Sequence, residues 1–515
     1  MVRVQRLAGD MSSSRRLVRR QWVSIVALLV VATVIRLIEL GDGLWYDEIL
    51  TWLSYGEMPF LQIVTTYDSQ NQHILFSLLS RLSLTVFGST PWALRLPAVV
   101  FGVAGIGALW LLGRDVSIHE PADGCEAVRV RAEPLLAAAF LTFSYHHVWF
   151  SQNARGYTGL LFWSLLSTWF FLRALRAGRA LDWAGFAMCI AMGVYTHLTM
   201  LFVVAGQFLA FGLAPVTQEG PQVERPDAGS ATSARWWFRG LVYGFGLAGL
   251  LTLLLYGPVL GQLFGGLTGE EGAVAVWKNP LWTLLEFARE MRVGLSGVVI
   301  AIFALLPFAL GLVSTWRRAP SLVIVVLVPP VLGTLVMLTM DHYLWPRFYF
   351  FAFGFCVLIM ITGAFELAVL GGRVLKWSSW RANRAGVALS LLLVLASATT
   401  VPTAYGPKQD FHGAFDYVAA QRRPNDAVVT VGLTTLPFER WIGADFLSAE
   451  NGAELDAIRA SAERTWLLYT LPLHLEAEYP EIAKRLEHDF EVIRRFHGTL
   501  NGGDIVVCRY DHSSK

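Results

Sequence analysis

Charged residues are scarce in this chain. Asp, Glu, Lys and Arg make up 16% of its 515 residues, against roughly 25% in a typical soluble protein. Hydrophobic residues account for 55%, and the mean hydropathy is +0.49. A globular protein of this length would have too few charges to cover its surface. The composition therefore excludes an ordinary soluble protein and predicts a chain that crosses a membrane several times.

The chain also lacks a strong net charge and clustered cysteines. Its formal net charge is +2, so no basic field indicates binding to nucleic acid. The four cysteines, Cys125, Cys189, Cys356 and Cys508, lie far apart and form no Cys-x-x-Cys motif or Cys/His cluster. The sequence therefore supports neither a structural zinc site nor a disulfide framework.

Long apolar runs are what the chain does contain. The first, 22–40, follows an arginine-rich arm and lacks a small-residue cleavage site, so we interpret it as a signal anchor. Ten more runs of bilayer length follow, at 91–113, 134–150, 156–172, 182–195, 198–214, 237–258, 294–315, 320–339, 345–371 and 385–402. We therefore expect an all-α membrane domain of about eleven transmembrane helices.

The placement of Lys and Arg predicts the orientation. If the short apolar segment 73–88 does not cross the membrane, 21 Lys/Arg lie in the loops on the N-terminal side, and about six lie in the opposite loops. If it crossed, every later loop would change sides and the positive-inside rule would be violated repeatedly. We therefore interpret 73–88 as an amphipathic juxtamembrane helix at the outer interface. The N-terminus is then cytoplasmic and the C-terminus lies outside, in a multi-pass protein of the cell (inner) membrane.

The composition changes after residue 402. Residues 403–515 hold 12 of the 41 Lys/Arg, and short β-rich runs (427–431, 465–469 and 504–510) alternate with helical stretches such as 478–490. The expected organisation is a cytoplasmic basic arm (1–21), a membrane domain (22–402) with a first outer loop (41–90), and a small periplasmic or extracytoplasmic α/β domain (403–515).

Polar residues collect on the predicted outer face. They occur in the first outer loop, in two tight connections further along and before the tenth predicted span: 45–48, 68–73, 151–157, 195–197 and 341–349. Carboxylates, Arg, His and Tyr at the ends of several spans are typical of a catalytic bowl. A transporter would place such residues near the middle of the bilayer, on interrupted helices of two related halves, and neither feature is evident.

These residues carry a resemblance to a known family. The motifs are, in chain order, Arg36-Leu37, Leu44-Trp45-Tyr46-Asp47-Glu48, Asn71-Gln72-His73, Phe87-Gly88, Trp92-Ala93-Leu94-Arg95-Leu96-Pro97, Ala154-Arg155-Gly156-Tyr157, Tyr195-Thr196-His197 and Pro346-Arg347-Phe348-Tyr349. Together they resemble the bacterial branch of the protein O-mannosyltransferase and aminoarabinose-transferase group, within the GT-C class of glycosyltransferases. The resemblance implies an enzyme that transfers a sugar from a polyprenyl-phosphate donor to an acceptor on the outer side of the membrane.

Asp47 matches the catalytic carboxylate of that family. Displacement at the anomeric carbon, with inversion, needs a base that takes the proton of the acceptor hydroxyl, and Asp47 is our candidate. Its neighbour Glu48 would hold the acceptor or orient groups around Asp47, because adjacent residues of a helix point in different directions. The alternative is that Asp47 only caps a helix that begins at Ile49.

Other residues are candidates for binding the donor or the acceptor. The leaving polyprenyl phosphate needs fixed positive charge, and Arg155 and Arg347, each followed within two residues by a Tyr, could supply it; otherwise they only anchor their helices. The complete set of substrate-binding candidates is Arg155, Tyr157, Arg347, Tyr349, His73, Arg95, His197, Tyr195 and Lys278. His73 departs from the family pattern because Ile74-Leu75 stand where prolines are usual. The alternative for Tyr195 and His197 is a purely structural role in their turn, and the alternative for Lys278 is a solvated loop side chain.

The monophosphate-donor group that the chain resembles generally needs no metal. The first outer loop contains no Asp-x-Asp motif, so we expect no cofactor, although a divalent metal is not excluded. The expected partners are the lipid bilayer, a polyprenyl-phosphate sugar, and a protein, lipid or glycan acceptor. Two other functions stay open, a lipid-linked-sugar flippase or transporter and a membrane-anchored envelope-assembly protein.

Overall fold

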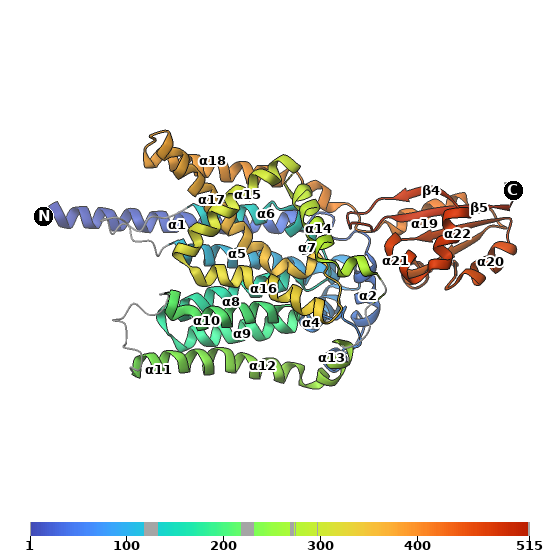
Figure 1. Ribbon diagram of the computed structural model, residues 1–515, viewed down its shortest axis with the longest axis horizontal. Coiled ribbons are helices and arrows are strands. Elements are labelled where there is room, and N and C mark those ends of the chain that lie inside the picture. The colour runs from blue at the N-terminus through green and yellow to red at the C-terminus, as the bar shows by residue number, and fades with distance from the viewer. Residues whose placement is uncertain are drawn as a thin grey trace.

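The computed structural model describes residues 2–117, 132–217, 231–267, 272, 274–295 and 297–512. Most of the described chain is a bundle of helices that run side by side along one direction (Figure 1). The helices of the bundle and its outer loops are α1 (Val2–Leu37), α2 (Tyr46–Tyr55), α3 (Phe60–Thr65), α4 (Ile74–Phe87), α5 (Pro91–Ser117), α6 (Glu133–Thr142), α7 (Tyr145–Ser151), α8 (Tyr157–Ala177), α9 (Ala180–Thr196), α10 (Met200–Thr217), α11 (Ala231–Phe238), α12 (Leu247–Tyr256), α13 (Leu260–Leu267), α14 (Pro280–Gly294), α15 (Val298–Arg318), α16 (Pro320–Thr339), α17 (Phe353–Val374) and α18 (Ser379–Ala398).

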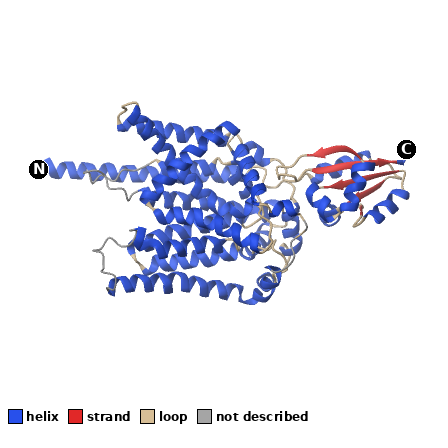
Figure 2. Ribbon diagram, in the orientation of Figure 1, coloured by secondary structure: helices blue, strands red, loops and turns tan. Residues whose placement is uncertain are grey.

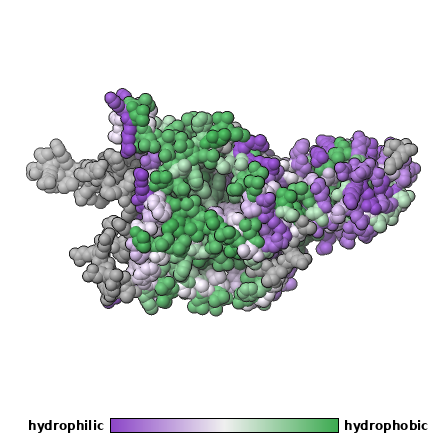
Figure 3. Space-filling view, viewed as in Figure 1, coloured by the Kyte–Doolittle hydropathy of each residue, from purple (hydrophilic) through white to green (hydrophobic). Residues whose placement is uncertain are grey.

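The bundle has the length and surface of a membrane domain. Eight helical segments among the described residues are long and apolar enough to cross a bilayer: Arg19–Leu37, Pro91–Val116, Tyr157–Ala177, Met200–Thr217, Arg235–Gly265, Pro320–Thr339, Pro346–Val374 and Ser379–Tyr405. Apolar residues cover the flank of the bundle, and polar residues gather at its two ends and on the tail (Figure 3). The predicted fold class is confirmed in its main features, while the number of eleven crossings stays a prediction.

The predicted span 134–150 is not one helix. It is divided into α6 and α7 at Phe143 and Ser144, where the Ser144 side chain accepts a hydrogen bond from the His147 N–H and begins a new helix. A serine within a run of apolar and aromatic residues has too little effect on hydropathy for the break to be predicted.

Helix α4 corresponds to the segment that we placed at the interface. Its small polar residues Ser77, Ser80 and Ser83 are buried, whereas Leu82 and Val86 are exposed. The Ser80 hydroxyl donates to the Leu94 carbonyl at 3.1 Å. The polar side therefore faces protein and the apolar side faces outward, as is typical of a helix in contact with lipid.

The tail contains the strands of the described chain (Figure 2). Its elements are α19 (Phe411–Gln421), β1 (Ala427–Thr430), β2 (Leu447–Ser448), α20 (Gly452–Ala460), β3 (Arg464–Tyr469), α21 (Pro472–Glu478), α22 (Pro480–Asp489), β4 (Glu491–Phe496) and β5 (Ile505–Asp511). The sheet order is β2-β1-β3-β5-β4, with β1 parallel to β2 and β3, and β5 antiparallel to β3 and β4. The register pairs Val429 with Leu447 and Leu467 with Cys508.

The tail and the first outer loop share a hydrophobic core. Leu44 and Ile49 belong to the same buried cluster as Phe411, Val418 and Trp466 of the tail. Trp52 of α2 also meets Trp441 edge to face, with ring centroids 5.2 Å apart. The tail is therefore packed against α2, at the end of the bundle opposite the N-terminus (Figure 1).

Candidate active site

Asp47 lies in the first turn of α2 and faces two guanidinium groups. Its Oδ2 is 4.0 Å from Nη1 of Arg155 and 3.9 Å from Nη2 of Arg347. Its side chain is 16% exposed, so a substrate can reach it. The alternative that Asp47 caps a helix beginning at Ile49 is wrong, because α2 begins at Tyr46 and its N-cap is Trp45.

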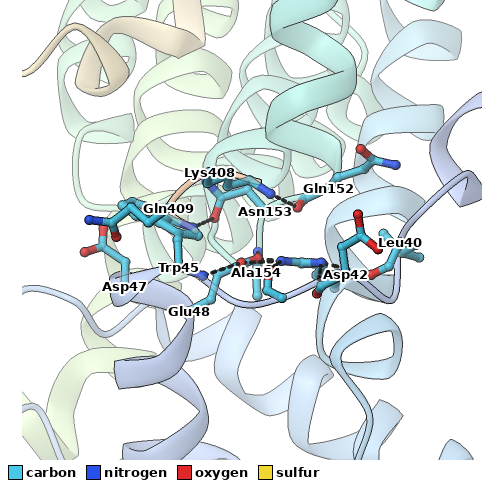
Figure 4. Close-up of polar contacts among 12 residues, drawn as sticks. Leu40, Asp42, Trp45, Asp47, Glu48, Gln152, Asn153, Ala154, Lys408 and Gln409 are labelled. Atoms are coloured by element: carbon cyan, nitrogen blue, oxygen red, sulfur yellow. Dashed lines mark hydrogen bonds and ion pairs between the residues drawn. The ribbon is translucent and has the colours of Figure 1, made fainter. Parts of the chain in front are cut away.

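Glu48 points away from Asp47 (Figure 4). It is 0% exposed and forms an ion pair with Arg95 of α5, with Oε2 2.6 Å from Nη2 and Oε1 2.8 Å from Nε. Oε1 also accepts from the Ala154 N–H at 2.7 Å. Burial alone would raise the pKa of Glu48, but the charges of Arg95 and Lys408 and these hydrogen bonds lower it below its ordinary value. Glu48 is therefore a buried anion that holds the start of α2, and its oxygens do not face the site at Asp47.

Arg95, the ion-pair partner of Glu48, also holds the chain that precedes α2. Its guanidinium donates to the carbonyls of Leu40, Asp42 and Gly43 at 2.9–3.0 Å. It thereby binds the chain that leads from α1 into α2. In this position Arg95 contacts Glu48 and backbone, which differs from the substrate contact that the sequence had led us to expect.

Arg155 lies in the turn between α7 and α8. It is buried, its Nη1 donates to the Asn71 carbonyl at 3.1 Å, and its guanidinium carbon is 5.8 Å from the Tyr157 ring centroid. A Cβ on the neighbouring Gly156 would meet the Thr196 carbonyl oxygen at 2.7 Å. This glycine therefore allows the close packing that brings Arg155 beside Asp47.

Two neutral imidazoles lie behind Arg155. The rings of His73 and His197 are stacked with centroids 4.5 Å apart, and Tyr157 contacts both. Burial, followed by the charges of Arg155 and Arg347, lowers the pKa of His197 to about 3, and burial lowers that of His73 well below its ordinary value. The Nδ1 of His197 bonds to Thr199, while the Nε2 atoms of both rings have no hydrogen-bond partner in the described chain. Because the Nδ1 of His197 accepts from the Thr199 N–H at 3.3 Å, the proton of this neutral ring lies on its buried Nε2. His73 bonds to the Thr196 backbone through its other nitrogen, so its buried Nε2 is an acceptor.

Arg347 follows Trp345 and Pro346 in a 3₁₀ segment, Pro346–Ala352, before α17. Its guanidinium lies 4.7 Å from the Trp345 ring centroid, and its side chain is 22% exposed. Arg347 and Trp45 line a cavity of about 840 Å³ that extends between α14, α15, α16 and α17. Asp47 does not line this cavity, but it lies beside Arg347, which does.

Three other predicted residues lie apart from Asp47. Tyr349 lines the cavity and its hydroxyl bonds to that of Thr334 at 2.8 Å. Tyr195 is buried against the ring of Tyr256. Lys278 pairs with Asp341 at 2.5 Å. No described contact of these three side chains joins them to Asp47, Arg155 or Arg347.

Two residues of the tail that contact these segments are not predicted from the sequence. Lys408 and Gln409 contact the segments that carry Arg155 and Asp47, and Figure 4 shows both. They follow the last predicted span and belong to none of the motifs, so the sequence contains no signal for them. Among the described residues, no group of three or more His, Cys, Asp and Glu side chains could hold a metal ion. Metal-independent chemistry stays a prediction.

Comparisons with known proteins concern the family and the fold of the chain. Residues 71–219 match the model of a family described as dolichyl-phosphate-mannose-protein mannosyltransferase. No curated protein sequence matches significantly. The fold is similar to that of the oligosaccharyltransferase AglB from Archaeoglobus fulgidus, in complex with an inhibitory peptide and a dolichol-phosphate, with 13% identity and a TM-score of 0.52 over 95% of this chain and 74% of that chain.

A second solved structure covers almost all of both chains. It is ArnT from Cupriavidus metallidurans bound to undecaprenyl phosphate, with 12% identity and a TM-score of 0.50 over 96% of this chain and 98% of that chain. The resemblance recognised from the motifs is thus confirmed by the family match and by the fold. The chain has the fold of GT-C membrane glycosyltransferases, and its residues 71–219 carry the sequence pattern of the dolichyl-phosphate-mannose-protein mannosyltransferase family.

Proposed function

We propose that this chain transfers one sugar from a polyprenyl-phosphate donor to an acceptor hydroxyl, with inversion at the anomeric carbon and with Asp47 as the general base. The observation that carries the proposal is the reachable carboxylate of Asp47 between Arg155 and Arg347, where Arg347 lines a mainly apolar cavity. A base, two fixed cations and space for a hydrocarbon chain are the parts that this reaction needs.

The reaction is a single displacement. The acceptor oxygen forms a bond to the anomeric carbon while the bond from that carbon to the phosphate oxygen breaks. The acceptor proton passes to Asp47, and the polyprenyl phosphate leaves with the bonding electrons. Its charge changes from a monoanion towards a dianion, which Arg155 and Arg347 stabilise.

The cavity suits the hydrocarbon part of the donor. Its wall is built mainly from apolar and aromatic side chains, and it reaches Leu305 and Val331, which are exposed on the apolar flank of the bundle. A prenyl chain can therefore enter from the bilayer while its phosphate stays near Arg347.

The site and the tail belong, in this proposal, on the outer side of the cell membrane. The tail lies at the end of the bundle opposite the N-terminus (Figure 1), and the arginine-rich loops predict that the N-terminal end is cytoplasmic.

Reconstitution tests this function against the alternatives. The purified chain is placed in liposomes with polyprenyl-phosphate sugar and a membrane extract as the source of acceptor. A transferase releases free polyprenyl phosphate as the sugar appears on the acceptor with inverted configuration. Movement of intact donor across the bilayer without release would indicate a flippase, and the absence of both would favour an assembly protein.

A further inference from the structure

The segment Pro407–Gln409 joins the last membrane helix to the tail, and the tail determines its position. The Thr499 N–H donates to the Pro407 carbonyl at 2.8 Å, and the Leu500 N–H donates to the Lys408 carbonyl at 3.2 Å. A Cβ on Gly498 would lie 2.2 Å from the Lys408 carbonyl oxygen. The connection between β4 and β5 is therefore packed directly on this segment.

Gln409 binds the start of α2. Its Oε1 accepts a hydrogen bond from the Tyr46 N–H at 3.0 Å, and its Nε2 donates to the Thr470 hydroxyl at 3.2 Å. The Tyr46 N–H lies in the first turn of α2, where backbone donors have no partner within the helix. The carboxamide therefore links the sheet of the tail to the residue that precedes Asp47.

Lys408 binds the turn that carries Arg155. Its Nζ donates to the Gln152 carbonyl at 2.6 Å and lies 5.4 Å from the Trp149 ring centroid. Burial lowers the pKa of Lys408 to about 7, although the charge of Glu48 acts in the opposite direction. One residue further along, Asn153 Oδ1 accepts from the Trp45 indole at 3.3 Å, so the two segments meet here (Figure 4).

We propose that Lys408 and Gln409 are positioning residues that fix the distance between Asp47 and Arg155. Neighbouring in the chain, they bind the two membrane-domain segments that carry the base and one phosphate-binding cation. The inference rests on the proposed function. It assigns to the tail a direct part in the geometry of the reaction, because a displacement of reacting groups by about 1 Å can cost a factor of about 100 in rate.

The attachment of the tail does not depend on these two side chains. The shared core of Leu44, Ile49, Phe411 and Trp466 already buries apolar surface between tail and loop. Burying a lysine and a carboxamide costs free energy of desolvation. Lys408 and Gln409 offset this cost with hydrogen bonds at two defined points. Replacing them should therefore change the geometry of the site while the tail stays attached.

Two variants and one control test the proposal in reconstituted liposomes. Gln409→Leu removes the acceptor of the Tyr46 N–H and should lower kcat about tenfold or more, with the donor KM within about twofold. Lys408→Met frees the turn of Arg155 and should raise the donor KM about fivefold, with kcat changed less. Gln409→Glu, which keeps an acceptor oxygen, should restore most of the lost kcat. Tyr405→Phe, which removes the hydrogen bond from the Tyr405 hydroxyl to the Ile35 carbonyl just before this segment, should behave as wild type.

The outcomes distinguish a failure of the proposed function from a failure of the positioning role alone. If wild type transfers no sugar, the proposed function fails. If wild type transfers sugar but Gln409→Leu has wild-type kcat, or both variants and Tyr405→Phe lose activity in the same way, only the positioning role is overturned.

Discussion

Adjacent carboxylates at the start of α2 have opposite environments. Asp47 is reachable and faces Arg155 and Arg347, while Glu48 is buried against Arg95. The sequence predicted that Glu48 would hold the acceptor or orient groups around Asp47, and it left these two roles open because a motif does not show what each neighbour contacts. The difference arises because side chains one residue apart on a helix point in different directions.

Glu48→Gln should destabilise the fold. Breaking a buried ion pair leaves the Arg95 charge without compensation and costs about 3 kcal/mol of unfolding free energy. Thermal unfolding in detergent measures the loss, with the exposed residue Glu487 changed to Gln as the matched control. Unchanged stability combined with lost transfer would instead identify Glu48 as a substrate contact.

Arg347→Ala should weaken binding of the donor about tenfold, because a charge-assisted contact to phosphate is lost. Binding of labelled polyprenyl phosphate to the protein in nanodiscs measures this. Arg373→Ala, at the other end of α17, is the control. Equal affinity of Arg347→Ala and wild type would remove Arg347 from the phosphate site.

At the scale of elements, hydropathy predicted the long apolar helices but not the break within 134–150, and it predicted the edges of the tail poorly. Strands β1, β3 and β5 lie within one residue of their predicted ranges, since each is an apolar run. Strand β4 was missed because it is an edge strand whose Arg494 and Arg495 carry charge. Lys408 and Gln409 were missed because Gln409 meets Tyr46 across 363 positions of sequence, and only the folded tail creates that contact.

We expect stability to depend on pH because Lys408 is buried at the junction of tail and bundle. The pKa of Lys408 falls from 10.5 to about 7 on folding, so the unfolded chain binds this proton more tightly than the folded chain does. The free energy of unfolding therefore rises with pH from about 7 towards 10.5. The midpoint of thermal unfolding of wild type, relative to Lys408→Met, should rise between about pH 6 and about pH 9. A constant difference would contradict the shifted pKa.

At the scale of the whole molecule, one apolar bundle separates two polar ends (Figure 3). The family match spans residues 71–219, while the similar solved folds span nearly the whole chain. The sequence could predict the polytopic architecture because apolar runs of bilayer length leave few alternatives. It could not predict how the tail packs on α2, because that contact depends on side chains from distant segments.

The orientation can be measured with single cysteines in a cysteine-free background. A membrane-impermeant thiol reagent applied to intact cells should label Glu487→Cys in the tail and should not label Arg381→Cys near the start of α18 until the membrane is opened. Both positions are exposed in the structure. The reverse pattern would place Asp47 and the tail on the cytoplasmic side.

Sugar transfer by Asp47→Asn shows whether Asp47 is the general base. In liposomes supplied with polyprenyl-phosphate sugar and acceptor, we expect transfer to fall about a thousandfold or more, with donor binding retained, because the general base is lost. Asp341→Asn is the matched control, since Asp341 pairs with Lys278 and has a left-handed backbone that asparagine tolerates. Transfer by Asp47→Asn at the wild-type rate would show that Asp47 is not the general base.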